Sequence, residues 1–324
     1  MAAQQPYQRP HEGKLGIVTG GSRGIGAAVA RRLAAKGCNL LLVYTSDSST
    51  EPTRALREEL AAAHGIRTAM LQADLLDGEA AAPRVVQAAR DLFSSYRGSG
   101  EASPPLQIDI LVNNAGVSSN QTLNDPDLGP VTAAEFDRVY RVNVLAPLLL
   151  MQAIAPHLPL PTSASGNQQQ AGRVVNVSSV SSSIGYEGQS VYAGTKAALE
   201  AMTRCWSREL AGRATVNAVN PGPAWGDMYA EVGEKFWRIN QPHVDAAPLA
   251  RYDGSGTGAE AAVRQLAGDD YARFDSLVRE KMRGRRPGFT SEIAGTIDML
   301  CSDEAGWTTG SVVCANGGMK MSIA

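Results

Sequence analysis

Two side chains four residues apart could form a proton-transfer pair. Tyr192 and Lys196 stand at the start of a run that predicts a helix, and residues four apart share one helix face. A phenol has a pKa of about 10, which a neighbouring ammonium lowers by favouring the phenolate. Such a tyrosine can protonate a carbonyl oxygen or deprotonate an alcohol. An isolated pair is more often a solvated helix face, so the rest of the chain decides between the two interpretations.

A glycine-rich turn near the N-terminus could hold a phosphate group. The apolar run 15–19 leads into Gly20, Gly24 and Gly26, and residues 27–36 then have the pattern of an amphipathic helix closed by Gly37. Between a strand and a helix, such glycines let backbone N–H groups approach a pyrophosphate. The spacing is not Gly-x-Gly-x-x-Gly, but the strand–turn–helix context favours nucleotide binding over a simple tight loop.

Several further motifs follow in order, and together they resemble the short-chain dehydrogenase/reductase family over nearly the whole chain. The family's Thr-Gly-x-x-x-Gly-x-Gly turn fits residues 19–26, and its Tyr-x-x-x-Lys fits 192–196. The resemblance is to NADP(H)-dependent carbonyl reductases and 3-oxoacyl-carrier-protein reductases. The remaining matches are Asn113-Asn114-Ala115-Gly116, Asn143 in Arg-Val-Asn-Val, Ser178-Ser179 at a strand end, Asn220-Pro221-Gly222, and the tail segments 309–313 and 316–318.

The resemblance implies four catalytic residues. Tyr192 is the expected general acid, and Lys196 is expected to lower its pKa and hold the nicotinamide ribose. Ser179, which the family's spacing selects over the preceding serine, is expected to donate to the carbonyl oxygen. Asn143 is expected to hold a water that links Lys196 to solvent; the alternative is a buried Asn that satisfies a helix kink near Pro147. The cofactor supplies the hydride.

The end of the second predicted strand indicates the nicotinamide cofactor. An acid there would bind the ribose 2′-hydroxyl and repel a 2′-phosphate. Tyr44 follows the strand 39–43 instead, and Asp47 lies three positions late. Arg23 could pair with a phosphate, so the sequence favours NADP(H). The residues expected at the cofactor are Gly20, Ser22, Arg23, Gly24, Ile25, Gly26, Tyr44, the hydroxyl donors Thr45 and Ser46, Asp74 as the family's adenine contact, Leu75, Asn113, Ala115, Gly116, Tyr192, Lys196, Pro221, Gly222 and Ala224.

Alternating strand and helix patterns from Leu15 to Val219 predict an α/β fold with one Rossmann-type, doubly wound parallel sheet. Residues 1–324 are expected to form a single domain. The cofactor-binding and catalytic core spans 14–222, an extended helical substrate lid 223–290, and the last helix–strand unit with the tail 291–324. Two stretches rich in Ser, Gly, Pro or Gln, 94–105 and 159–172, predict surface loops.

The lid segment carries eight of the aromatic side chains. Most are expected to form a small core for the extra helices. Trp225 and Tyr229 follow the cofactor turn directly, so they are expected to face the substrate with Ser179 and Tyr192. Gly226 stands where the family usually has a Thr that touches the cofactor, which gives the lid more freedom.

Composition bounds the partners and the location. The chain has 324 residues, 44% hydrophobic and 19% charged, with a net charge of -2, which gives no indication of nucleic acid or an anionic membrane. No apolar run reaches the roughly 18 residues of a membrane span, and residues 1–14 lack a signal-peptide pattern. Four cysteines without C-x-x-C spacing suggest a reduced, cytoplasmic protein, and scattered histidines suggest no metal site. The resemblance implies a homo-oligomer, either a dimer or a tetramer.

Several functions remain open. The lid aromatics favour an NADPH-dependent reductase acting on a carbonyl of a bulky, aromatic or polyketide-like small molecule. A 3-oxoacyl-carrier-protein reductase would need a basic patch near the active site to bind the carrier protein. Residues 283–286 could form such a patch, or they could be a solvated helix C-terminus. An NAD-dependent secondary-alcohol dehydrogenase is a further alternative. A non-catalytic nucleotide-binding protein is disfavoured because all four catalytic positions are intact.

Overall fold

A seven-stranded sheet forms the centre of the protein, in the order β11-β8-β7-β4-β1-β2-β3, with every pairing parallel. The computed structural model describes residues 9–97, 104–160, 171–226, 229–230, 233–252 and 258–321. The predicted doubly wound α/β fold is confirmed. The strands are β1 (Leu15–Thr19), β2 (Asn39–Tyr44), β3 (Thr68–Gln72), β4 (Ile110–Asn113), β7 (Gly172–Val177), β8 (Ala214–Pro221) and β11 (Val312–Ala315).

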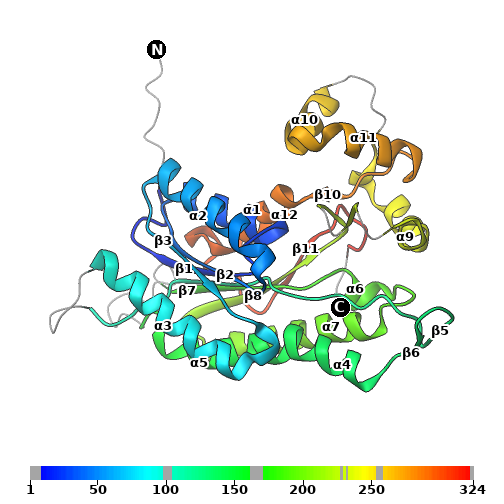
Figure 1. The fold of residues 1–324 in the computed structure, drawn as a ribbon. Helices are drawn as coiled ribbons and strands as arrows, with labels where there is room; N and C mark the ends of the chain where they lie inside the picture. Colours follow the sequence, from blue (N-terminus) through cyan, green and yellow to red (C-terminus); the bar gives the residue numbers. More distant parts are fainter. Residues whose placement is uncertain are drawn as a thin grey trace, which may run out of the picture.

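Helices cover both faces of the sheet (Figure 1), so the central strands are buried on both sides, as their continuous apolar runs require. One layer holds α1 (Gly24–Ala35), α2 (Thr50–His64) and α12 (Thr290–Cys301). The other holds α3 (Gly78–Arg97), α4 (Ala133–Tyr140), the π-helical turn η3 (Arg141–Leu145), α5 (Ala146–Ile154), the short α6 (Ser181–Ile184) and α7 (Ser190–Glu209). Short 3-10 turns are η1 (Asp47–Ser49), η2 (Leu75–Asp77), η4 (Ala155–His157), η6 (Pro248–Ala250), η7 (Gly268–Asp270) and η8 (Asp303–Ala305).

One predicted loop begins too early. Residues 94–97 continue α3, because Phe93 is buried and Tyr96 packs edge-on against it, with ring centroids 5.5 Å apart. The helix period therefore outweighs the Ser-rich composition. Residues 98–103, and 161–170 of the second predicted loop, lie outside the described residues.

The lid lies over the carboxyl-end edge of the sheet (Figure 1). Its aromatic side chains form a core of their own, in which the Phe274 ring contacts Trp225, Tyr252 and Phe289 at centroid distances of 5.0, 5.5 and 5.0 Å. Its elements are β9 (Ala224–Trp225), α9 (Glu234–Ala246), α10 (Gly258–Ala267), α11 (Tyr271–Glu280) and β10 (Gly288–Phe289), and a small hairpin of β5 (Asn124–Asp125) and β6 (Gly129–Pro130) lies apart from them.

One helical run in the described part of the chain, Ala133–His157, is long and apolar enough to cross a membrane by length and composition. Its α5 portion buries Leu150, Met151 and Ile154 in the core shared with α3, as a core helix of this fold does. The four cysteines are free. Among the described residues no group of three His, Cys, Asp or Glu side chains is arranged to hold a metal ion.

Candidate active site

The expected site segments meet at one edge of the sheet, because the carboxyl ends of parallel strands lie together. The glycine turn follows β1, residues 113–116 end β4, Ser179 follows β7 and Pro221 ends β8. In the strand order, β1 lies between β4 and β2, so the chain reverses direction across the sheet at β1. This is the switch point at which open α/β sheets bind their ligands.

The glycine turn forms a cradle that only glycine can form. Gly20 and Gly24 have φ values of 64° and 59°, and a Cβ on Gly26 would lie 2.2 Å from the Gly20 carbonyl oxygen. Arg23, the N-cap of α1, makes no side-chain capping bond, which leaves the first N–H groups of the helix for a phosphate. Ser22 and Ile25 are partly exposed beside them. The turn therefore fits the pyrophosphate of a dinucleotide.

Thr19 and Asn114 hold this turn from behind. Asn114 Nδ2 donates to the Thr19 and Gly20 carbonyl oxygens at 2.9 and 3.1 Å, while Thr19 Oγ1 accepts from the Asn114 and Ala115 N–H groups at 3.0 Å each. The Asn113 side chain instead points into the core and donates to Asn176 Oδ1 at 2.9 Å. Asn113 can therefore contribute only backbone atoms to a cofactor.

The end of β2 differs in part from expectation. The Tyr44 ring is buried, and its hydroxyl accepts from Thr50 Oγ1 at 3.3 Å, so the side chain is a packing element. Thr45 and Ser46 are exposed, as the predicted hydroxyl donors must be. Asp47, the acid that could have favoured NAD, accepts from Gln72 Nε2 at 2.8 Å.

The remaining expected cofactor residues lie along the same crevice. Asp74 is exposed and caps η2 through its Oδ1, which accepts from the Leu76 N–H at 3.0 Å, while the Leu75 side chain is buried. Gly222 approaches the tail so closely that a Cβ there would lie 3.1 Å from the Asn316 Cα. Pro221 and Ala224 flank it at the ends of β8 and β9.

Tyr192 and Lys196 lie on one face of α7, which begins at Ser190. Lys196 Nζ is 5.6 Å from the centre of the Tyr192 ring and donates to the Val177 carbonyl oxygen at 2.8 Å. Burial lowers the pKa of Lys196 to about 8, and the carboxylate of Glu200 acts in the opposite direction. Burial raises the pKa of the phenol, and a hydrogen bond with Ser179 partly offsets it. The expected effect of Lys196 on the pKa of Tyr192 therefore stays a prediction.

The two candidate serines point in different directions at the end of β7. Ser179 Oγ donates to Ser181 Oγ at 3.1 Å and is the serine hydroxyl close enough to Tyr192 to lower the pKa of the phenol. Ser178 is buried, and its Oγ donates to Glu200 Oε1 at 2.6 Å. The structure therefore brings Ser179, and not Ser178, to the phenol.

Asn143 lies in the π-helical turn η3, beside the active-site lysine. Its Oδ1 accepts from the Val117 N–H at 2.9 Å, and its Nδ2 donates to the Val117 oxygen at 2.8 Å and to Thr195 Oγ1 at 3.1 Å. A Cβ on Gly116 would lie 3.2 Å from Asn143 Oδ1 and 3.4 Å from Lys196 Nζ. The two side chains therefore converge on one point, where a shared water would fit the expected role.

Comparison with known proteins agrees with this geometry. Residues 14–236 match the short chain dehydrogenase family model. The chain belongs to this family. It is therefore an oxidoreductase acting on CH–OH and C=O groups.

The most similar relatives include two fungal reductases. The short chain dehydrogenase described here is 65% identical to an L-xylo-3-hexulose reductase of Hypocrea jecorina, over 98% of this chain and 99% of that protein. It is 53% identical to an L-xylulose reductase of Aspergillus niger, over 96% and 99%. A solved structure of a blue fluorescent protein from a metagenomic library, in complex with NADPH, is 30% identical. It matches with a TM-score of 0.70, over 96% of this chain and all of that one.

A chain of polar side chains lies behind Ser179 in this dehydrogenase, and no sequence pattern indicated it. Ser181 Oγ donates to Gln189 Oε1 at 2.7 Å, and Gln189 Nε2 donates to Asn120 Oδ1 at 2.8 Å. Gln189 lies three residues before Tyr192, and Asn120 follows β4. The available sequence signal was the position of Gln189 within one turn of Tyr192, because Asn120 is remote in sequence.

The two lid residues expected at the substrate differ in their placement. Trp225 belongs to the lid core, where its ring stands edge-on to Phe274 and its Nε1 donates to Asp270 Oδ2 at 2.8 Å. The indole is therefore not available to a substrate, which corrects the expectation. Tyr229 is also largely buried, but it lies near Tyr186, between α6 and α7. Burial mainly raises the pKa of Tyr186, and Tyr229 adds to this effect.

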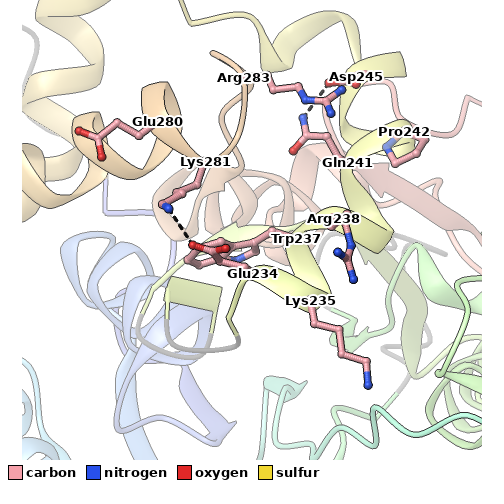
Figure 2. Close-up of a pocket in the computed structure, with 10 residues that line it drawn as sticks. All are labelled: Glu234, Lys235, Trp237, Arg238, Gln241, Pro242, Asp245, Glu280, Lys281 and Arg283. Atoms are coloured by element: carbon pink, nitrogen blue, oxygen red, sulfur yellow. Dashed lines mark hydrogen bonds and ion pairs between the residues drawn. The ribbon is translucent and has the colours of Figure 1, made fainter. Parts of the chain in front are cut away.

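Figure 2 shows a second cleft in this dehydrogenase, of about 430 Å³, between α9 and the segment after α11. Lys235, Arg238, Lys281 and Arg283 line it together with acidic side chains, and Lys281 pairs with Glu234 at 2.7 Å. None of the catalytic residues lines this cleft. It therefore lies outside the site of carbonyl reduction.

Proposed function

We propose that the protein is an NADPH-dependent reductase of the ketone group of an open-chain ketose. The observation that carries the substrate class is the polar chain Ser179–Ser181–Gln189–Asn120. Its accessible members, Ser179 and Asn120, can pair with the hydroxyls of a polyol, and the buried Ser181 and Gln189 hold them in place. The fungal relatives reduce sugar ketones by name. The lid aromatics that favoured a bulky aromatic substrate pack against one another instead, so they no longer support that choice.

The cofactor is NADP(H), which the solved relative carries as NADPH. The residues that would hold it are the glycine turn at the pyrophosphate and, at the adenosine phosphate, Arg23 with Thr45 and Ser46. Arg23 is exposed at the N-terminus of α1. Its guanidinium would add to the partial positive charge of the helix N-terminus in binding a phosphate. When bound, NADPH supplies the hydride.

The protein's own groups manage the proton and the developing charge. The raised pKa of Tyr192 keeps the phenol protonated at neutral pH, which suits a proton donor to the alkoxide. Ser179 donates to the same oxygen, which stabilises its negative charge. Lys196 adds positive charge behind the phenol and is expected to hold the ribose, while Asn143 holds a water beside it.

A panel of carbonyl compounds tests the substrate class. NADPH oxidation is measured with L-xylulose, L-xylo-3-hexulose, an aromatic ketone, an acetoacetyl thioester and cyclohexanone. We expect the ketoses to have the highest kcat/KM. Gln189→Leu removes the amide that holds Asn120. It should lower kcat/KM for the best ketose about 10-fold more than for cyclohexanone, because roughly 1.4 kcal/mol of hydrogen bonding from Asn120 is lost only with the polyol. Preference for the aromatic ketone or the thioester would contradict the proposal.

We also propose a cytoplasmic homodimer or homotetramer. The free cysteines suit a reducing compartment, and light scattering of the purified protein at assay concentration measures its assembly. A monomer would contradict the proposed assembly.

A further inference from the structure

A third side chain continues the catalytic face of α7 beyond Tyr192 and Lys196. Glu200 follows Lys196 by four residues, so all three lie on the same side of the helix. Glu200 is only 5% exposed. A carboxylate buried to this degree is costly unless its surroundings stabilise the charge, so its place beside the active site requires a physical reason.

Three donors from different segments meet on one oxygen of this carboxylate. Glu200 Oε1 accepts from Ser178 Oγ at 2.6 Å, Ser182 Oγ at 2.8 Å and Asn220 Nδ2 at 3.1 Å. Asn220 Nδ2 also donates to the Ser179 carbonyl oxygen at 2.8 Å. The carboxylate thus joins α7 to the segments that precede and follow Ser179.

The same carboxylate is the acidic neighbour of Lys196. Lys196 is 4% exposed, and within the described ranges it forms no ion pair; its Nζ donates to a backbone oxygen. A buried ammonium without a counter-charge tends to lose its proton. Glu200 opposes the lowering of the Lys196 pKa that burial causes.

Few other titratable groups face this part of α7. Tyr140 of α4 approaches Gly194, where a Cβ would lie 2.6 Å from its hydroxyl, and Arg141 of the adjoining η3 is exposed. From the sheet side, β11 contributes Cys314, whose pKa is raised mainly by burial and also by Glu200. Neither the cationic Arg141 nor the Cys314 thiol, whose pKa is raised, can replace the negative charge of Glu200 at neutral pH.

We propose that Glu200 is a positioning residue for ketone reduction: its buried charge keeps Lys196 protonated, and its hydrogen bonds fix the strand end that carries Ser179. The inference rests on the proposed reductase function. Glu200 acts through Lys196 and Ser179 and touches neither substrate nor cofactor. Its removal should therefore change the pH dependence of the reaction more than the binding of ketose.

The main test compares Glu200→Gln with the wild type. Glutamine keeps the oxygen on which the three donors converge, so the variant is expected to fold. We expect kcat to fall at alkaline pH as Lys196 loses its proton, near pH 8 in the wild type. In Glu200→Gln this alkaline limb of the kcat profile should lie about one pH unit lower. That shift lowers kcat about 5-fold at pH 8 and less than about 2-fold at pH 6, with the KM for ketose unchanged. Glu209→Gln, at the exposed end of α7, is the matched control and should leave the limb in place.

Glu200→Asp separates charge from packing. It keeps the charge but shortens the side chain, so its limb should stay within about half a pH unit of the wild type. A Glu200→Gln limb that coincides with the wild type would overturn the proposal, and so would a uniform loss of kcat at every pH. The proposal would also be overturned if the alkaline limb of kcat in Glu200→Asp moved as far as it does in Glu200→Gln.

A binding measurement keeps this inference distinct from the proposed function. NADPH affinity is followed by quenching of tryptophan fluorescence from pH 6 to about pH 9, without ketose. Because Lys196 is expected to hold the ribose, affinity should weaken at lower pH in Glu200→Gln than in the wild type. If the protein reduces no ketose, the proposed function is wrong, but the NADPH titration still tests the role of Glu200. Identical pH dependence of NADPH affinity in Glu200→Gln and the wild type would overturn that role.

Discussion

Ser178 and Ser179 are adjacent, yet their hydroxyls serve opposite sides of the strand end. The Ser178 hydroxyl donates to the buried Glu200 carboxylate at 2.6 Å, and the Ser179 hydroxyl faces Tyr192 and donates to Ser181. Neighbouring side chains leave an extended strand in opposite directions. The division of roles between the two serines therefore follows from the backbone.

Replacing each serine in turn tests this division. Ser179→Ala should lower kcat by on the order of 10²-fold, as expected when one donor to a developing oxyanion is lost. Ser178→Ala leaves two donors on Glu200, so kcat should fall by less than about 5-fold. Both variants are compared in steady-state assays with the best ketose. A larger loss in Ser178→Ala would mean that the wrong serine has been assigned.

Tyr192→Phe tests the proton donor. It keeps the ring and removes the hydroxyl, so kcat should fall by at least about 100-fold, the lower bound for general acid catalysis. NADPH affinity, measured by fluorescence quenching, should change less than about 2-fold because the phenol acts on the alkoxide. Retention of more than about half of the activity would contradict this mechanism.

Local patterns predicted much of the fold and of the site. The strand, the glycine turn and the helix at residues 15–35 are specified by neighbours in sequence, and the pairing of Tyr192 with Lys196 follows from the helix period. The hydrogen bond that Gln189 donates to Asn120 joins residues 69 apart, so no periodic pattern contains it. The helix period could also have indicated Glu200, since it follows Lys196 by four residues, as Lys196 follows Tyr192.

The wrong expectation for Trp225 has a physical cause as well. Trp225 was assigned to the substrate because it follows the cofactor turn, but the Phe274 ring and the Asp270 carboxylate that hold it come from elements about 45 residues later. The pKa of Tyr192 depends on how deeply the phenol is buried. Burial is a property of the assembled fold, which the neighbouring lysine alone does not reveal.

His11 should make the stability of the protein sensitive to acid. The side chain is fully buried, neither ring nitrogen has a hydrogen-bond partner among the described residues, and burial, followed by the charge of Lys14, lowers its pKa from 6.5 to about 4. Above pH 6.5 both states are neutral, so its contribution to stability is fully present. As the pH falls toward 4, the unfolded chain binds a proton that the folded chain does not.

The loss from this group is on the order of 3 kcal/mol by pH 4. In His11→Leu, the midpoint of urea unfolding should therefore fall less between pH 7 and about pH 4.5 than in the wild type. His64→Gln, at the C-terminal end of α2, serves as the control and should follow the wild type. Parallel pH dependence in His11→Leu and the wild type would exclude His11 as the acid-sensitive group.

Arg23 is expected to determine the preference for NADPH over NADH. It is exposed at the N-terminus of α1, and a guanidinium there can pair with the 2′-phosphate but gains nothing from a ribose hydroxyl. Arg23→Ala should raise the KM for NADPH about 10- to 100-fold, equivalent to roughly 1.4–2.8 kcal/mol, and leave the KM for NADH nearly unchanged. Arg54→Ala on α2, which removes an exposed Arg already paired with Glu51, is the control for a general loss of positive charge. Steady-state kinetics with both cofactors measure the preference. If wild-type kcat/KM is higher with NADH, the assignment of NADP(H) is wrong, and Asp47 at the start of η1 becomes the residue to test.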